Sequence, residues 1–131
     1  MHGFAYDCPT TVEEALAAMR EDGARALAGG TDLIPQLRAG QRSATRIVDL
    51  KRIPALTDIV READGRTVLG AAATATRVAQ DPVVADSYPG LAAAARLVGA
   101  RQVQNRASLG GNICNAAPSA DTVPALKIGR A

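Results

Sequence analysis

The chain has 131 residues, 47% of them apolar, but its only aromatic residues are one phenylalanine and two tyrosines. Its 15 basic and 13 acidic residues give a net charge of +2 and are interspersed, which, with the scarcity of base-stacking aromatics, argues against nucleic acid as a partner. The two cysteines, Cys8 and Cys114, stand far apart without a Cys-x-x-Cys or Cys/His cluster, which argues against a metal or iron–sulfur site built by this chain alone.

The first fifty residues alternate short apolar segments with helical patterns. Thr11 and Glu14 have the spacing of a capping box at a helix start, and Gly23 stands where that helix is expected to stop. The pair Gly29-Gly30 separates a short apolar segment from the next helical pattern. The expected order is strand, helix, strand, glycine loop, helix and strand, over residues 4–7, 11–19, 25–28, 29–31, 32–39 and 47–50.

The second half is predicted to begin with a hairpin and to continue with helices. Asp64-Gly65 indicates a tight turn between strands over residues 57–62 and 67–72. Thr74 or Thr76 is expected to cap a short helix that ends near residues 81–82. The alanine-rich residues 91–98 predict a stronger helix, residues 107–117 a half-buried loop of small residues, and residues 119–121 the start of a last helix.

No secretory signal or membrane span is expected. Residues 1–7 lack a basic region followed by an apolar one, and no apolar run approaches the length of a membrane-spanning helix. Two free thiols in a reducing compartment are favoured over a disulfide, which stays open as an alternative. We therefore expect a soluble, cytoplasmic protein.

The first glycine motif, Gly29-Gly30-Thr31, lies between a predicted strand and a predicted helix. Glycines there allow a ligand to approach the backbone, and the helix N-terminus favours an anion such as a phosphate. The motif alone is more often an ordinary turn, and it is neither a P-loop nor the Gly-x-Gly-x-x-Gly dinucleotide fingerprint. Asp32 is favoured as a helix-start residue over a ligand contact through its side chain, because a carboxylate would repel a pyrophosphate.

The second glycine motif has more of the features of a binding loop. Successive small residues can form a nest of backbone N–H groups for an oxyanion, and a half-buried loop is costly unless its polar groups find partners. A polar surface loop is an equally weighted alternative before any resemblance is considered. The polar and glycine residues concerned are Ser108, Gly110, Gly111, Asn112 and Asn115, with Leu109, Ile113 and Cys114 interleaved.

Other candidate residues are assigned smaller roles. Asp121 can accept hydrogen bonds from ribose hydroxyls or simply start a helix, and the two roles are compatible. His2, the only histidine, is given no catalytic role, and the cysteines are favoured as small packing residues over nucleophiles. Arg101 and Arg106 are expected on a solvated face.

Taken together, the two motifs resemble those of a known family. Residues 27–33 (Leu-Ala-Gly-Gly-Thr-Asp-Leu) and 102–116 (Gln-Val-Gln-Asn-Arg-Ala-Ser-Leu-Gly-Gly-Asn-Ile-Cys-Asn-Ala) stand in the order found in the FAD-binding (medium) subunit of molybdenum hydroxylases. That group includes carbon monoxide dehydrogenase and xanthine dehydrogenase. Residues 4–9, 47–50, 69–71 and 88–91 fit as well, so the resemblance spans almost the whole chain.

The resemblance implies an α+β fold of the PCMH-type FAD-binding class. It implies a small N-terminal α/β subdomain over residues 1–53 and part of a second subdomain, with a mostly antiparallel sheet and helices, over residues 54–131. FAD is expected between them, with the pyrophosphate between the two motifs and Asp121 near the ribityl chain and the flavin ring. The implied FAD-binding residues are Leu27, Ala28, Gly29, Gly30, Thr31, Asp32, Val98, Gly99, Ser108, Gly110, Gly111, Asn112 and Asp121.

The resemblance also implies a division of labour among subunits. Molybdopterin and 2Fe-2S clusters are expected only in partners, a molybdenum-containing large subunit and an iron–sulfur small subunit. FAD then passes electrons from the clusters to an acceptor, and this chain has no catalytic residue or metal of its own.

Three departures from the family pattern bear on the function. Gln104 replaces a basic residue common in the second motif, which is expected to weaken an electrostatic contact. The chain has about half the length of family members, and residues 127–131 deviate from the expected apolar helix, so a truncated remnant that does not hold FAD alone is the alternative function. An oxidase with covalently bound flavin is less favoured, because Cys114 is the only cysteine or histidine in either motif.

Overall fold

The computed structural model describes residues 3–117 and 120–127. His2 and the unusual end of the chain, residues 128–131, lie outside the described residues. Within them, no helix is long and apolar enough to cross a membrane.

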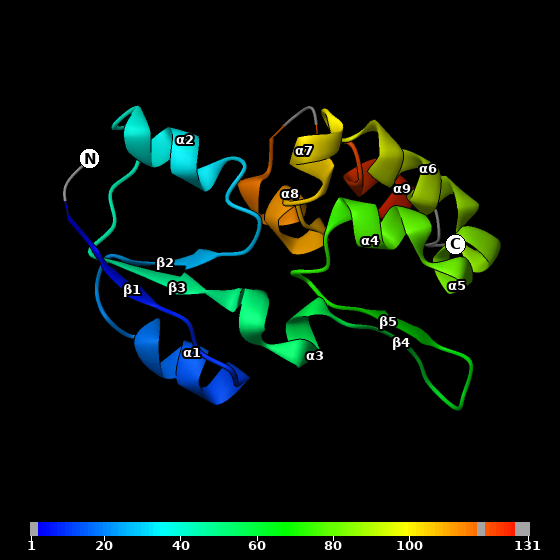
Figure 1. Cartoon of the computed structure of the whole chain (residues 1–131), viewed down its shortest axis with the longest axis horizontal. Helices are drawn as coiled ribbons and strands as arrows, with labels where there is room; N and C mark the ends of the chain where they lie inside the picture. The colour runs from blue at the N-terminus through cyan, green and yellow to red at the C-terminus, as the bar shows by residue number, and fades with distance from the viewer. Residues whose placement is uncertain (1–2, 118–119, 128–131) are drawn as a thin grey trace.

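A three-stranded parallel sheet with a helix on each face forms the N-terminal part (Figure 1). Strand β3 lies between the other two and pairs with both. The elements are β1 (Ala5–Asp7), α1 (Val12–Ala18), β2 (Ala24–Leu27), α2 (Leu33–Arg38) and β3 (Arg46–Asp49). These match the predicted order closely, and each strand is shorter than or equal to its predicted range.

The central strand explains why both faces of the sheet are covered. Ile47 packs with Leu27 and Leu37 on the α2 face, whereas its neighbour Val48 packs with Ala15 and Ile53 on the α1 face. Ile47 and Val48 are both 0% exposed. Consecutive apolar residues are typical of a parallel strand that is buried on both faces.

The capping box at the start of α1 is confirmed. The Thr11 hydroxyl accepts a hydrogen bond from the Glu14 N–H at 3.2 Å, and the Glu14 carboxylate accepts one from the Thr11 N–H at 3.3 Å. The expected stop at Gly23 is wrong, because α1 ends at Ala18 and Gly23, with φ of 79°, instead forms the turn into β2. A positive φ is the conformation for which glycine is favoured.

A short connection leads from the sheet to a hairpin. It consists of η1 (Leu50–Arg52) and α3 (Pro54–Thr57), and it is followed by the antiparallel strands β4 (Ile59–Arg61) and β5 (Thr67–Leu69). The predicted hairpin is confirmed, with Gly65 at φ of 88° in its turn, although both strands are shorter than predicted.

Small and medium apolar residues hold the remaining helices together. Thr74 caps α4, since its hydroxyl accepts a hydrogen bond from the Arg77 N–H at 3.2 Å, and Asp81 caps α5. The core of this helical cluster is Ala, Val and Leu, as the composition predicts. Its elements are α4 (Ala75–Gln80), α5 (Pro82–Ser87), α6 (Pro89–Leu97), α7 (Arg101–Gln104), α8 (Leu109–Asn115) and α9 (Val123–Lys127).

The α+β class is confirmed, but the prediction of a loop over residues 107–117 is wrong. Residues 109–115 form α8, and residues 101–104, for which no helix was predicted, form α7. In the part of the chain that the structure describes, the antiparallel component is the β4–β5 hairpin and an isolated bridge between Thr74 and Ser108. Ile53 and Leu56 pack in one cluster, so apolar contact continues across the predicted boundary at residue 53, and that division stays a prediction.

Candidate functional site

One cavity of about 590 Å³ lies where the sheet meets the helical cluster. Its volume is within the range of small-molecule and cofactor sites. It is lined from the sheet side by β2, the loop after it and the start of α2, and from the other side by residues near α6, α7 and α8. All thirteen residues that the sequence assigned to cofactor binding line this cavity: Leu27, Ala28, Gly29, Gly30, Thr31, Asp32, Val98, Gly99, Ser108, Gly110, Gly111, Asn112 and Asp121.

Glycine is required at position 29 because the backbones of the two sides of the cavity lie in close contact there. A Cβ at Gly29 would lie 2.1 Å from the backbone oxygen of Arg106 and 2.9 Å from the Cα of Ala107. Gly30 has φ of 78° and redirects the chain into α2. The first motif is therefore fixed against the segment that precedes the second motif, and each glycine has its own steric reason.

The loop between β2 and α2 carries a run of unpaired backbone donors. The N–H groups of Gly29, Gly30, Thr31 and Asp32 donate no hydrogen bond to another described residue. The first turn of α2 closes through the Ile34 N–H and the Gly30 oxygen at 3.2 Å. Unpaired N–H groups ahead of a helix present partial positive charge, which suits an anionic group.

Asp32 stands at the start of α2, as predicted, but it does not cap the helix through its side chain. Its backbone oxygen accepts from the Gln36 N–H at 3.0 Å, whereas the exposed carboxylate makes no capping hydrogen bond.

The second glycine motif is a helix start, and the predicted nest of free N–H groups is wrong. All four leading donors are paired: Leu109 N–H with Ala73 O at 3.4 Å, Gly110 N–H with Ala71 O at 2.7 Å, Gly111 N–H with Ser108 Oγ at 3.1 Å, and Asn112 N–H with Ser108 O at 2.9 Å. The Ser108 hydroxyl is thus the N-cap of α8. This motif supplies the cavity with a wall rather than with backbone donors.

The two glycines of α8 have different neighbours. A Cβ at Gly110 would lie 2.7 Å from the Ala71 oxygen and 2.8 Å from the Ala71 Cβ, so glycine is required by the adjacent chain. A Cβ at Gly111 would approach only the Ser108 hydroxyl, at 2.8 Å. Because Gly111 also lines the cavity, a larger side chain there would extend into the space of a ligand.

Asn112 anchors the segment that carries Asp121. Its Oδ1 accepts from the Thr122 hydroxyl at 2.6 Å and from the Thr122 N–H at 3.3 Å. Thr122 is only 2% exposed, so these bonds satisfy buried donors. The Asn112 Nδ2 donates to no described residue, which leaves it as the part of this amide that can reach a ligand.

Val98 and Gly99 form part of the cavity lining, and Gln104 stabilises this segment through hydrogen bonds to its backbone. The buried Gln104 amide donates to the Arg96 oxygen at 2.7 Å and to the Gly99 oxygen at 3.4 Å. Gly99 has φ of 49°, and a Cβ there would lie 3.1 Å from the Val103 Cβ. The sequence predicted only that Gln104 weakens an electrostatic contact. The structure shows that its neutral amide has a structural role, because it pairs with two backbone carbonyls at and just after the end of α6.

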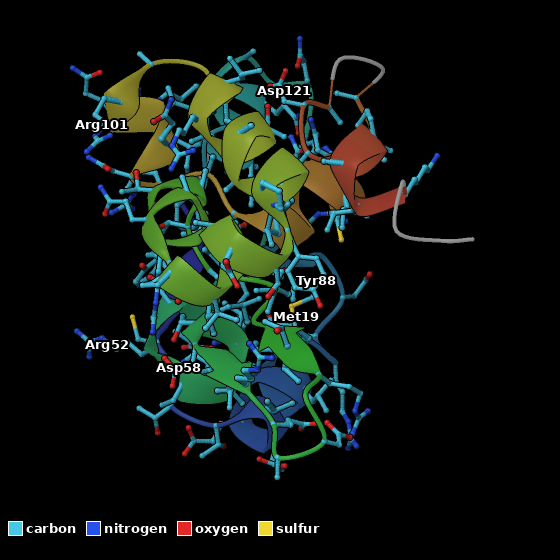
Figure 2. The ribbon with its side chains drawn as sticks, turned by 90° about the vertical axis from the view of Figure 1, so that its right-hand side faces the viewer. Met19, Arg52, Asp58, Tyr88, Arg101 and Asp121 are labelled. Carbon is cyan, nitrogen blue, oxygen red and sulfur yellow. The ribbon has the colours of Figure 1, made fainter. Side chains whose placement is uncertain are left out.

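The basic residues of the cavity are different from those considered in the sequence. Arg25 and Arg42 line it, whereas Arg101 and Arg106 are exposed and do not. Figure 2 shows Arg101 at the outer edge of the helical cluster, well apart from Asp121. The expectation for Arg101 and Arg106 is thus confirmed. The lining by Arg25, Gln36 and Arg42 was missed because no local motif marks these positions, whereas Cys114 and Asn115, which also line the cavity, belong to the second motif.

A polar cluster lies next to the cavity at the end of β3. The Tyr6 hydroxyl donates to the Asp49 carboxylate, which also accepts from the Lys51 N–H at 2.9 Å and from Lys51 Nζ at 2.7 Å. The hydrogen bond to Asp49, with burial, raises the pKa of Tyr6. Burial opposes ionisation of Asp49, but the bonds from Lys51 and Tyr6 outweigh it and lower the pKa of Asp49.

No group of three or more metal-ligating side chains occurs among residues 3–117 and 120–127. Cys8 is partly buried and Cys114 is exposed, and neither forms a disulfide. The chemistry of the cavity, as far as the described residues define it, is that of unpaired backbone donors, small apolar side chains, a few amides, and the charged side chains of Arg25, Arg42, Asp32 and Asp121.

Comparison with known proteins identifies the family. The profile of the FAD binding domain in molybdopterin dehydrogenase matches residues 2–131. The chain is 37% identical over 124 residues to a putative xanthine dehydrogenase FAD-binding subunit of Escherichia coli, covering 93% of this chain and 42% of that protein. It is also 37% identical over 127 residues to the carbon monoxide dehydrogenase medium chain of Hydrogenophaga pseudoflava, covering 95% and 44%.

Solved structures of two oxidoreductases share the fold. Carbon monoxide dehydrogenase from Hydrogenophaga pseudoflava superimposes with a TM-score of 0.79 at 35% identity, covering 84% of this chain and 39% of that one. Quinoline 2-oxidoreductase from Pseudomonas putida superimposes with a TM-score of 0.80 at 33% identity, covering 86% and 39%. The chain thus spans about two fifths of the length of the relatives it matches. It belongs to the family of FAD-binding domains in molybdopterin dehydrogenases.

Proposed function

We propose that this chain holds FAD in the 590 Å³ cavity, with the pyrophosphate against the unpaired N–H groups of residues 29–32. The observation that supports this most strongly is the convergence of two distant motifs on one cavity, in a chain whose family is defined by FAD binding. Backbone N–H donors ahead of a helix suit phosphate oxygens. The Thr31 hydroxyl, which pairs with no described residue, adds one side-chain donor beside them.

The remaining cavity residues are proposed to enclose the rest of the cofactor. Gly111 is proposed to leave room next to the pyrophosphate, and the Asn112 Nδ2, which donates to no described residue, is proposed to donate to it. Val98 and Gly99 form an apolar wall for the ring system, and Asp121 accepts hydrogen bonds from hydroxyls of the ribityl chain. We further propose that the parts enclosing FAD are residues 1–53 and residues 54–131.

The proposed role of the bound FAD is electron transfer within a multi-subunit dehydrogenase. Relatives are named as FAD-binding or medium subunits of xanthine and carbon monoxide dehydrogenases, which makes this chain an oxidoreductase component. FAD supplies the redox chemistry when it is bound, and the residues of this chain bind it, orient it and limit its contact with water. Electrons are proposed to come from iron–sulfur clusters in a small subunit, which receive them from a molybdenum-containing large subunit.

The test of the proposal is a fluorescence titration of the purified chain, and of the same chain co-expressed with its dehydrogenase subunits, with FAD. Saturable quenching of flavin fluorescence with a one-to-one end point is expected. The titration curve of a chain that lacks a site would stay linear in both preparations. That outcome would support the alternative that the chain is a remnant without FAD.

Two variants locate the site. Gly111→Val is expected to abolish binding, because its side chain enters the cavity beside the pyrophosphate. Gly90→Val is the matched control, since a Cβ at Gly90 would meet no atom within 4 Å and Gly90 does not line the cavity. Thr31→Val removes only a hydroxyl and is expected to weaken binding by about 0.5–1.5 kcal/mol. If Gly111→Val retains full flavin content in folded protein, the assignment of α8 to the pyrophosphate wall is wrong.

A further inference from the structure

One hydrogen bond closes the cavity between its two sides. The Gln36 Nε2 in α2 donates to the Asn115 Oδ1 in α8 at 3.2 Å, and both residues line the cavity. Within the described part of the chain, it is the one hydrogen bond between residues 3–49 and residues 58–127. In Figure 1 the covalent connection, η1 and α3, lies low in the view, and α2 and α8 face each other above it.

The two side chains are held in position by their own helices. Leu37, the neighbour of Gln36, is 5% exposed and packs against the sheet with Leu27 and Ile47, which fixes the rotation of α2. Helix α8 is fixed by the pairing of its first N–H groups with Ala71 and Ala73. Two anchored helices can therefore be joined by a single amide pair without ordering a flexible segment.

We propose that the Gln36–Asn115 pair is a clasp that holds the two sides of the cavity together and so slows the release of the bound flavin. This rests on the proposed FAD site. Both are positioning residues: the clasp acts through the spacing of the first motif and α8, and it adds to the close backbone contact of Gly29 with Arg106. When this bond is broken, α2 and α8 can move apart at the edge of the cavity while each side stays folded.

The test measures flavin release from Gln36→Ala, Asn115→Ala and the double variant. Each single variant is expected to release FAD about two- to tenfold faster, as fits the loss of one neutral hydrogen bond. The double variant is expected to be no faster than the singles, because the same bond is lost in all three. Thr76→Val is the matched control: it removes the bond of 2.6 Å between Thr76 and Asn105, away from the cavity.

A swapped pair separates a clasp from a general loss of packing. Gln36→Asn shortens the reach by one methylene and Asn115→Gln lengthens it, so each alone is expected to release FAD faster. Together they restore the combined length and are expected to return the rate toward that of the wild type. Additive effects of the two alanine variants, or a swapped pair no better than its singles, would overturn the clasp.

Hydrogen exchange without FAD keeps this test independent of the FAD site. Asn115→Ala is expected to speed the exchange of amides in α2, and Gln36→Ala that of amides in α8, while Thr76→Val changes neither. If the wild type binds no FAD, the proposed function fails and this reciprocal effect alone decides on the clasp. Variants that each alter exchange only in their own helix would refute it.

Discussion

The substitution Asn112→Ala separates the structural role of this amide from its proposed contact with FAD. It removes the acceptor of the Thr122 hydroxyl and of the Thr122 N–H, at 2.6 and 3.3 Å. Thr122 is 2% exposed, so water cannot replace the lost acceptor without rearrangement. Leaving a buried donor unpaired costs about 1–3 kcal/mol, and we expect that loss in the free energy of unfolding without any ligand.

Urea unfolding followed by far-UV circular dichroism measures this loss. With a slope of about 2 kcal/mol per molar urea, the midpoint is expected to fall by about 0.5–1.5 M. Thr122→Val is the partner control, because it removes the hydroxyl that needs the acceptor. The double variant is expected to be less unstable than the sum of the two singles. Unchanged stability of Asn112→Ala together with loss of FAD binding would refute the anchoring role and make Asn112 a ligand residue alone.

Three further predictions concern the framework around the cavity. Gly29→Ala is expected to prevent the two sides from meeting and to yield little folded protein, because its Cβ would lie 2.1 Å from a backbone oxygen; expression and circular dichroism equal to wild type would contradict this. The folded-state pKa of Asp49 is lowered, so the stabilising contribution of its carboxylate is present above its unfolded pKa of about 3.9 and is lost as the pH falls through the folded value. Asp49→Asn is therefore expected to be less stable at pH 7 and to show a flatter dependence of stability on acid pH. Parallel stability curves of the variant and the wild type would contradict this. Tyr6→Phe removes the hydrogen bond to Asp49, and its pH-dependent unfolding is expected to show the midpoint of the acid transition at higher pH, a shift that is absent if the bond contributes nothing.

Local signals predicted the N-terminal elements well. The capping box of Thr11 and Glu14 and the alternation of strands and helices depend on neighbouring residues, so they can be recognised without the fold. The glycine hairpin signal at residue 65 succeeded for the same reason. The thirteen candidate residues that line one cavity could be predicted as a set because the two motifs together identified the family. Each motif alone was equally consistent with an ordinary turn or loop.

The structure of the second motif could not be predicted from local propensity. Glycines and asparagines disfavour a helix, yet α8 forms because Ser108 caps it and because the chain at Ala71 and Ala73 accepts its first N–H groups. The roles of Gln104 and of the Gln36–Asn115 pair depend on residues far apart in sequence. Such tertiary partners carry no local pattern, which is why the sequence suggested a free nest where the structure has paired donors.

The central claim is that FAD binds with its pyrophosphate on the first motif and with α8 as a wall. The most direct measurement is a titration of the ¹⁵N-labelled chain with FAD, followed by the amide resonances of both motifs. We expect the largest shifts at Gly29, Gly30, Thr31 and Asp32, whose N–H groups are unpaired, and slow hydrogen exchange that persists at Gly110, whose N–H stays bonded to Ala71. Saturable binding of FAD that leaves the resonances of residues 29–32 unchanged would contradict the account.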